Sequence, residues 1–368
     1  MQDHPGVPDL LMEDVLLARV EALRDHSESL ELEAGFPLHR VTLFLSYACN
    51  LRCPYCKTIA RSPAELESLP QKQLTYTLAE FGRLLDKLGK TVEHLHFTGG
   101  EASIVPGVVE MVAEAKRRGV PHLSMTTNGT VSPTRYVELV QAGLTELRVS
   151  IDARDAALGA RMTGSARAWS KSIEAVKAVA AAREAGANVR LLANTVVGNA
   201  NRADLAGIVK YLLSLGPDDV KLITDVDARD GLPDFPEYGA VMAELRGLVA
   251  SLPAGRYPLL RRKLNTVFAK DSIGLEPTAA SRDGKSWRCY IPLTERTVDG
   301  LSYYPCSVYL RESGAPIGAL SDSPEEQRKK SATWVRENDC RTDPICQRYC
   351  LHCTRVFNDA TNKARKAR

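Results

Sequence analysis

Three cysteines near the start of the chain are spaced so that their thiols could bind iron or zinc. They are Cys49, Cys53 and Cys56, a C-x3-C-x2-C pattern. Iron–sulfur clusters are normally held by four cysteine thiolates, so three ligands leave one iron open to a small molecule. A structural zinc site needs a fourth ligand, and the next candidates, His94 and Cys289, are far along the chain. Zinc and metal-free buried thiols are the alternatives.

Three further motifs follow apolar runs that we expect to be strands. The first is Thr98-Gly99-Gly100-Glu101, where glycines allow close approach of the backbone to a ligand and the carboxylate can accept from an ammonium group. The others are Thr126-Thr127-Asn128-Gly129 and Ser150-Ile151-Asp152. Each alone could be ordinary turn chemistry, since Asn-Gly is a common turn dipeptide.

Together and in this order, the motifs resemble those of the radical S-adenosylmethionine (SAM) enzymes. The resemblance implies a [4Fe–4S] cluster at the three cysteines, whose open iron binds SAM and whose electron cleaves it to a 5′-deoxyadenosyl radical. An external one-electron reductant, such as flavodoxin or ferredoxin, is implied as a partner. The SAM contacts that the resemblance implies are Tyr55 near the adenine, Gly99, Gly100 and Glu101 at the amino group, Thr126, Asn128, Ser150 and Asp152 at the ribose and carboxylate, Arg161 at the methionine carboxylate, and Asn194.

Strands and helices alternate along the chain, which predicts an α/β fold. Strands are predicted at 41–46, 92–97, 122–126, 146–150, 188–197 and 219–224, and helices at 75–88, 108–118, 134–142, 171–185 and 203–215. Four glycines fall just after helices, as C′ glycines do: Gly119, Gly143, Gly186 and Gly216. Six parallel strands with outer helices are similar to the partial (β/α)6 barrel of the radical SAM family.

Polar residues recur on one face of the predicted strands, whereas a core-filled barrel would be apolar on both faces. We therefore expect a lumen that binds cofactor and a polar substrate. The candidate substrate contacts are His96, Arg190, Lys221 and Asp225. The alternatives are hydrogen-bonded structural histidines at His94 and His96, and a salt bridge among Arg190, Lys221 and Asp225.

Six more cysteines follow at Cys289, Cys306, Cys340, Cys346, Cys350 and Cys353, with an Asp-Gly hairpin signal at Asp299-Gly300. This region resembles the SPASM and twitch extensions of radical SAM enzymes, which bind auxiliary [4Fe–4S] clusters. The full SPASM pattern has another cysteine where Glu337 stands. The resemblance therefore implies one twitch-like cluster at Cys289, Cys306, Cys350 and Cys353. Cys340 and Cys346 are left as remnants, as ligands of a second cluster, or as a hydrogen-atom donor.

The 368-residue chain carries a net charge of +3, which argues against a nucleic-acid or membrane surface. Its first residues are unlike a signal peptide, and nine cysteines without an export signal indicate reduced thiolates in the cytoplasm. The predicted parts are an N-terminal helical extension at 1–40, with a helix at 13–24 packing on the barrel, the barrel at 41–254, a linker with a short helix at 255–285, and the cysteine-rich domain at 286–368.

The first functional hypothesis is oxidation of a polar small molecule, such as a sugar, aminocyclitol or nucleoside in natural-product biosynthesis, with the auxiliary cluster as electron acceptor. The absence of a separate leader-peptide-binding domain in the first forty residues favours this hypothesis. The alternative is crosslinking or epimerisation of a ribosomally made peptide. A third possibility, from another class, is a non-catalytic iron–sulfur or zinc scaffold.

Overall fold

One curved sheet organises the molecule. The structure is a computed structural model that describes residues 19–24, 30–33, 35–56, 76–88, 92–224, 237–266, 287–350 and 352–366. Within these residues nine strands form a single sheet in the order β6-β5-β4-β3-β2-β1-β7-β8-β9. The strands are β1 (Arg40–Phe44), β2 (His94–Thr98), β3 (His122–Thr127), β4 (Glu146–Ser150), β5 (Arg190–Val197), β6 (Asp219–Thr224), β7 (Glu295–Asp299), β8 (Ser302–Tyr304) and β9 (Gly318–Ala319).

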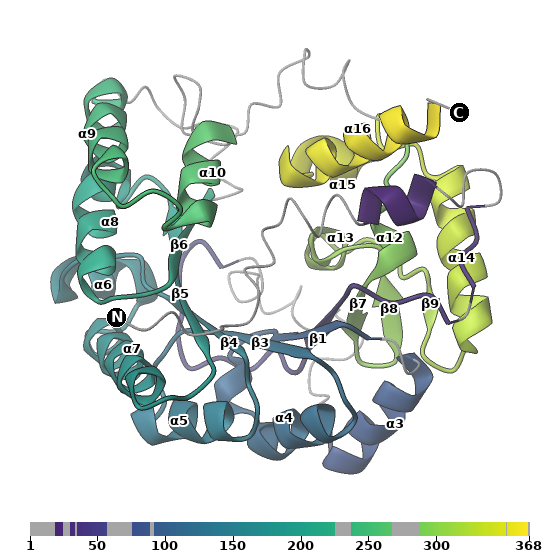
Figure 1. The fold of residues 1–368 in the computed structure, drawn as a ribbon, viewed down its shortest axis with the longest axis horizontal. Helices are drawn as coiled ribbons and strands as arrows, with labels where there is room; N and C mark the ends of the chain where they lie inside the picture. The colour runs from purple at the N-terminus through teal and green to yellow at the C-terminus, as the bar shows by residue number, and fades with distance from the viewer. Residues whose placement is uncertain are drawn as a thin grey trace.

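Helices cover the outer face of this sheet (Figure 1). Around the barrel they are α3 (Leu78–Leu88), α4 (Val108–Arg117), α5 (Pro133–Gln141), α6 (Ala156–Thr163), α7 (Ala168–Glu184), α8 (Leu205–Ser214) and α9 (Tyr238–Ala250). Helix α10 (Pro258–Thr266) lies on the other side of β6 from α8 (Figure 1). The C-terminal region adds α12 (Ile291–Thr294), α13 (Ser307–Arg311), α14 (Pro324–Glu337), α15 (Pro344–Tyr349) and α16 (His352–Lys366). None of the helices in the described ranges is both long and apolar enough to cross a membrane.

The predicted barrel is confirmed. Strands β1 to β6 are parallel to their neighbours, and β4 and β6 have the predicted bounds. The predicted helices correspond to α3, α4, α5, α7 and α8, and the four C′ glycines all have positive φ angles. Helices α6 and α9 were not predicted.

Helix α10 belongs to the barrel, although the sequence placed it in a linker at 255–285. The backbone N–H groups of Leu259 and Leu260 donate to the buried carboxylate of Asp219 on β6, at 2.9 and 3.2 Å. Leu260 and Leu264 are buried in the main core. A linker can therefore begin only after α10, and residues 267–286 lie outside the described part of the chain.

The C-terminal region extends the barrel sheet instead of forming a separate one. Strand β7 pairs in parallel with β1, with Phe44 opposite Asp299. It also forms the predicted Asp-Gly hairpin with β8, where Gly300 has a φ of 56°. The hairpin prediction is confirmed, but the pairing of β7 with β1 was not anticipated.

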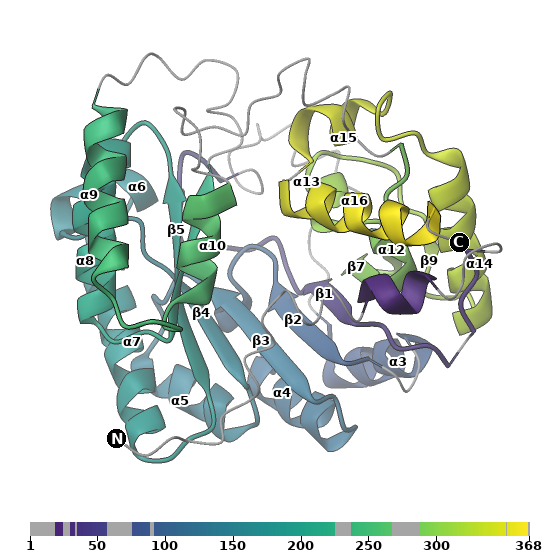
Figure 2. The same cartoon turned by 45° about the horizontal axis from the view of Figure 1, so that its top comes forward.

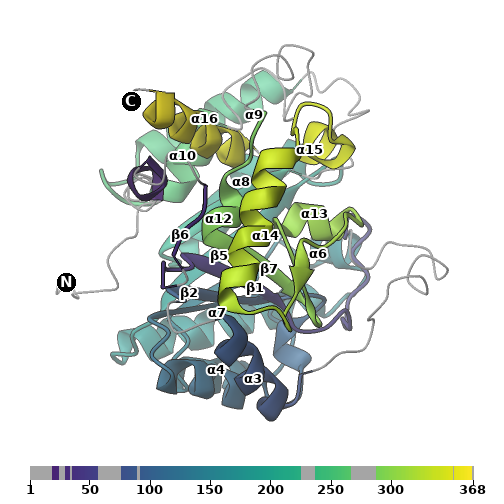
Figure 3. The same ribbon diagram turned by 90° about the vertical axis from the view of Figure 1, so that its right-hand side faces the viewer.

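The N-terminal segment packs on the C-terminal region, so the prediction that it packs on the barrel is wrong. Residues 19–24 are helical, and Val20 and Leu23 are buried in an apolar cluster with Tyr290 and Phe357. Arg19 also forms an ion pair with Glu295, at 2.7 Å. The short purple helix accordingly lies beside α12 and α16 (Figures 2 and 3).

The two faces of the strands differ as predicted. Alternate apolar residues, among them Leu95, Leu123, Leu147 and Leu191, are fully buried in the core beneath the outer helices. The opposite, concave face carries polar side chains at paired positions, including Ser124, Glu146 and Arg190. The concave face is therefore lined by hydrogen-bonding groups.

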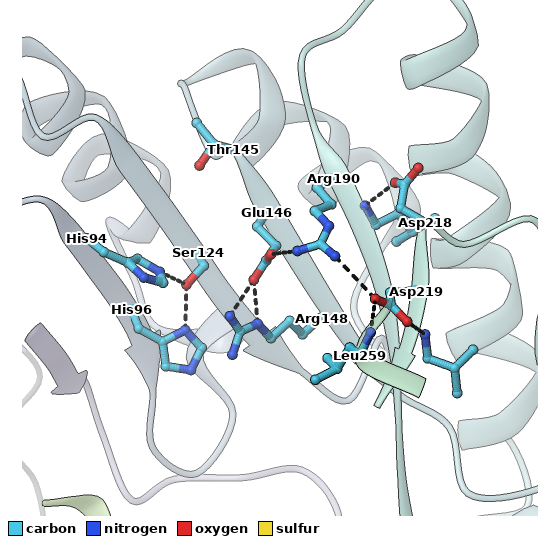
Figure 4. A network of polar contacts seen from close by, with 12 residues as sticks. His94, His96, Ser124, Thr145, Glu146, Arg148, Arg190, Asp218, Asp219 and Leu259 are labelled. Atoms are coloured by element: carbon cyan, nitrogen blue, oxygen red, sulfur yellow. Dashed lines mark hydrogen bonds and ion pairs between the residues drawn. The ribbon is translucent and has the colours of Figure 1, made fainter. Parts of the chain in front are cut away.

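Histidines on β2 are tied to this polar face (Figure 4). His94 Nε2 and His96 Nδ1 both lie within hydrogen-bond distance of Ser124 Oγ, at 2.6 and 2.7 Å. Burial, and next the charge of Arg40, lowers the pKa of both histidines well below its usual value. Both are therefore neutral hydrogen-bonded groups near neutral pH.

A chain of ion pairs crosses the same face from β4 to β6 (Figure 4). Arg148 Nε donates to Glu146 Oε1 at 2.5 Å. Arg190 bridges Glu146 Oε2 and Asp219 Oδ2, each at 3.3 Å. Burial acts to raise the pKa of Glu146, but Arg148 and Arg190 outweigh it and lower this pKa to about 2. Glu146 is thus an ionised carboxylate that forms ion pairs with both Arg148 and Arg190.

Replacing Glu146 with Gln should destabilise the protein in a pH-dependent way. Because the folded pKa is about 2 and the unfolded value 4.5, ionised Glu146 contributes stability above pH 4.5 that is lost as the pH falls towards 2. We expect a loss of about 3 kcal/mol in the free energy of unfolding at neutral pH, shrinking through that acidic window. Urea unfolding across this pH range measures it.

The matched control is Glu138→Gln on α5, where the carboxylate is 49% exposed and lies 3.8 Å from Arg135. It should change stability by less than about 1 kcal/mol. Equal losses for Glu138→Gln and Glu146→Gln, or a Glu146→Gln loss that does not vary with pH, would contradict the role of the buried network.

Candidate functional site

The cysteine loop follows β1 and rests on the end of β2. Gly100 N donates to Ser46 O at 2.6 Å, and Glu101 N donates to Ala48 O at 2.8 Å. A Cβ atom on Gly99 would lie 2.3 Å from Ser46 O, and one on Gly100 would lie 2.2 Å from Ala48 O. Because Gly99 and Gly100 have no side chains, the backbone that leads to Cys49 can pack directly against them.

The three thiols share one environment. Cys49, Cys53 and Cys56 are all partly buried, and their charges interact. Cys49 Sγ accepts from Leu51 N at 3.4 Å and lies 3.8 Å from Asn128 Nδ2. Burial raises the pKa of the Cys53 thiol to about 12. Two N–H groups directed at a sulfur suit a thiolate ligand, because donors to the charged form favour that form.

The chemistry of these side chains fits an iron–sulfur cluster. Within the ranges the structure describes, no three His, Cys, Asp or Glu side chains are grouped to hold a single metal ion. A [4Fe–4S] cluster binds its cysteines through different irons, so separate thiolates hold it. Cys49, Cys53 and Cys56 would supply three such thiolates, and two N–H groups lie near Cys49 Sγ.

Glu101 is used within the protein. Its carboxylate is 1% exposed and accepts from Ser103 N, Ser103 Oγ and Thr127 Oγ1 on one oxygen, at 3.0, 2.6 and 2.5 Å. Its other oxygen accepts from Asn128 N at 2.6 Å. The predicted role as acceptor for the SAM ammonium group stays a prediction. In this structure Glu101 joins the end of β2 to the end of β3.

Tyr55 lies against the end of β4. Its hydroxyl donates to Asp152 Oδ2, while Val196 N donates to Asp152 Oδ1 at 2.7 Å. Burial raises the pKa of Asp152 to about 6. The structure therefore brings together two residues that the sequence assigned separately to the adenine and to the ribose or carboxylate.

Asn194 carries an unpaired polar atom at this end of the barrel. The residue is 5% exposed, and its buried Oδ1 has no hydrogen-bond partner among the residues that the structure describes. It pairs with Ser150 on β4 and with Lys221 on β6. A buried acceptor without a donor costs free energy, so this position is suited to a ligand that donates a hydrogen bond. This is the observation that best fits a bound cofactor.

The remaining predicted SAM contacts are spread around the site. Thr126 Oγ1 lies 3.2 Å from His96 Nε2, and Arg161 is exposed on α6. Asn128 links the strands to the cysteine loop, since its Nδ2 also donates to Asn50 Oδ1 at 2.9 Å. Asn50 was missed by sequence reasoning, although it stands between two of the cysteines.

The predicted substrate contacts mostly follow the structural alternative. His94 and His96 are hydrogen-bonded to Ser124, as that alternative expects. Arg190 is ion-paired with Glu146 and Asp219, as a structural role expects. Lys221 pairs with Asn194 across the sheet and is partly buried, and Asp225 lies outside the described residues.

A second set of thiols gathers in the C-terminal region. The side chains of Cys289 and Cys340 are hydrogen-bonded to each other, and Cys340 is also hydrogen-bonded to Cys346. The charge of Cys350 acts on both Cys340 and Cys346, and the charge of Cys289 acts on Cys306. Five thiols therefore lie near one another.

This grouping places the two less certain ligand candidates beside members of the predicted twitch-like set. Cys340 and Cys346, left over in the twitch-like assignment, are in direct contact with each other, and Cys340 with Cys289. Cys306 accepts from Tyr309 N at 3.3 Å at the start of α13. Cys353 lies in α16, but its side chain is outside the described part of the structure.

Comparison with known proteins agrees with these features. The sequence profile of the Radical SAM superfamily matches residues 43–212. PqqA peptide cyclase of Rhodopseudomonas palustris is 28% identical over 369 residues, covering 90% of this chain and 92% of the relative. GTP 3',8-cyclase of Xanthomonas axonopodis pv. citri is 34% identical over 165 residues, covering 44% of this chain. This chain spans about half of that relative's length, 48%.

Solved structures share the fold along most of the chain. Streptococcus suis SuiB bound to precursor peptide SuiA gives a TM-score of 0.56 at 14% identity, covering 94% of this chain and 72% of SuiB. The protein anSMEcpe with bound AdoMet gives 0.58 at 15% identity, covering 89% and 96%. The predicted fold class, a partial barrel followed by a small cysteine-containing region, is confirmed, and residues 43–212 form a radical SAM domain.

Proposed function

We propose that this protein is a radical SAM enzyme that modifies a peptide by joining two of its side chains. The observation that carries the proposal is the match to PqqA peptide cyclase, which extends over 92% of that relative and so includes the C-terminal cysteine region. The fold shared with SuiB, which binds precursor peptide SuiA, supports it. This reverses the order of the two hypotheses drawn from the sequence.

Cys49, Cys53 and Cys56 would hold the first [4Fe–4S] cluster, and Asn194 and Asp152 lie where SAM contacts are expected. When bound, the first cluster and SAM would together supply a 5′-deoxyadenosyl radical that removes a hydrogen atom from substrate. A second cluster would supply a one-electron acceptor. The chain's own part is positional: Gly99 and Gly100 hold the cysteine loop, and Glu101 fixes the loop that carries Asn128. Flavodoxin or ferredoxin would supply the electron.

We assign the auxiliary cluster to the five C-terminal thiols that lie near one another, with Cys289, Cys340 and Cys346 at their centre. Cys306 and Cys350 complete the set. Because [4Fe–4S] clusters take four cysteines, one of the five thiols is spare. Cys340 and Cys346 thus serve as ligands in this proposal, not as remnants or hydrogen-atom donors.

Oxidation of a polar small molecule is the competing function. The match to GTP 3',8-cyclase supports this function. Because that match spans about half of the relative, it supports a shared cofactor domain more than a shared type of substrate. The non-catalytic scaffold predicts bound iron without cleavage of SAM. Both alternatives are outcomes of the experiment below.

The test uses the full chain, reconstituted anaerobically with iron and sulfide and reduced with dithionite. With SAM and peptides encoded next to its gene, we expect 5′-deoxyadenosine and a peptide that has lost the mass of two hydrogen atoms, both followed by mass spectrometry. Cys53→Ala should abolish both products, because it removes a ligand of the first cluster.

Cleavage of SAM with every peptide unchanged, together with oxidation of an aminocyclitol or nucleoside, would establish the small-molecule function instead. Bound iron without any 5′-deoxyadenosine would establish the scaffold. Retained 5′-deoxyadenosine in Cys53→Ala would refute the assignment of the first cluster.

Gly100→Ala should prevent the first cluster from assembling while leaving the barrel folded. The added Cβ would lie 2.2 Å from Ala48 O, a backbone atom that can move only if the cysteine loop moves. Of about eight irons per chain, about four should be lost, because the auxiliary cluster lies elsewhere. Iron and sulfide analysis measures this, with circular dichroism as the check on folding.

The matched control is Gly247→Ala on α9, where a Cβ would meet nothing within 4 Å. It should leave iron content unchanged and favour the helix slightly. Full iron content in Gly100→Ala would show that the loop tolerates displacement, contrary to the packing argument.

A further inference from the structure

Arg311 stands between the two groups of cysteines. It is the last residue of α13, the helix that starts directly after Cys306. Its guanidinium carbon lies 5.7 Å from the centre of the Phe44 ring, at the end of β1. Because the loop with Cys49 follows β1 directly, Arg311 connects the C-terminal thiols to the first cysteine site.

The position of Arg311 is set by contacts on both sides of its helix. Cys306 Sγ caps the start of α13 by accepting from Tyr309 N, at 3.3 Å. The Tyr309 hydroxyl donates to Asp343 Oδ2 at 2.9 Å, and Asp343 also accepts from Cys346 N at 2.8 Å. Helix α13 is thus fixed to the segment that carries the other C-terminal cysteines, and it lies towards the middle of the molecule (Figure 1).

The guanidinium of Arg311 makes no hydrogen bond or ion pair with any residue the structure describes. Two other arginines behave differently: Arg52 donates to Cys49 O at 2.8 Å, and Arg296 donates to Glu295 O at 2.8 Å. Arg311 is also solvent-exposed, so packing does not explain it. The charges of Cys56 and Cys306, one from each group of cysteines, act on it.

We infer that the positive charge of Arg311 raises the reduction potential of the iron–sulfur cluster at Cys49, Cys53 and Cys56. A cluster held by thiolates becomes more negative when it accepts an electron, and a cation close by favours the reduced form. The inference rests on the proposed function, because it requires that cluster. Arg311 would ease the reduction on which cleavage of SAM depends.

The experiment is a potentiometric titration, followed by electron paramagnetic resonance, of the anaerobically reconstituted full chain without SAM. The signal of the first cluster is the one that Cys53→Ala lacks. In Arg311→Met we expect the ratio of reduced to oxidised cluster at a fixed potential to fall about tenfold, which is about 59 mV for one electron. Arg311→Lys, which keeps the charge, should restore most of the shift.

The matched control is Arg256→Met, since the guanidinium of Arg256 lies 5.3 Å from the Tyr257 ring, outside the cysteine region. It should leave the potential unchanged. An unchanged potential in Arg311→Met with full iron content would overturn the inference, and so would equal shifts in the Met and Lys variants. A wild-type chain that takes up no iron would instead overturn the proposed function, so the two failures are distinguishable.

Discussion

The cysteine loop depends on a close approach between two stretches of backbone. Ser46 and Ala48 accept hydrogen bonds from the chain at Gly100 and Glu101, and no side chain fits between them at Gly99 or Gly100. The loop that carries Cys49 is therefore built directly on the end of a buried strand.

Glu101 extends that contact to the next strand. Its buried carboxylate accepts four hydrogen bonds, and the donors come from its own turn and from Thr127 and Asn128. Asn128 then reaches back to Asn50 and Cys49. The ends of β1, β2 and β3 are consequently one hydrogen-bonded unit, in which the cysteine loop is held from two sides.

The concave face of the barrel divides into two levels. Towards the start of the strands, Glu146, Arg190 and Asp219 satisfy one another, and the histidines are neutral and bonded to Ser124. Towards the other end, the buried Oδ1 of Asn194 has no donor in the described part of the chain. A polar atom that a ligand could use is thus found at the carboxyl ends of the strands, where the cysteine loop lies. Ligands bind at this end in parallel α/β sheets generally.

Local signals in the sequence predicted local structure well. The alternation along β4 and β6, the C′ glycines and the motifs after strands all appear where expected, because each depends on residues close together in the chain. Contacts between distant residues carried no such signal. Three examples are the contact of Asp219 with α10, the pairing of β7 with β1, and the contact between Cys340 and Cys289.

The pairing of β7 with β1 has a consequence for exchanging parts between related enzymes. Because β7 is a strand of the barrel sheet, a graft that replaces the C-terminal region from Glu295 onward would also replace a neighbour of β1. A chimera joined there would have to reproduce the register of Phe44 with Asp299, or the strand's side chains would turn to the wrong face. Exchanging the C-terminal thiols therefore calls for a junction beyond β8, at the cost of leaving Cys289 in the recipient.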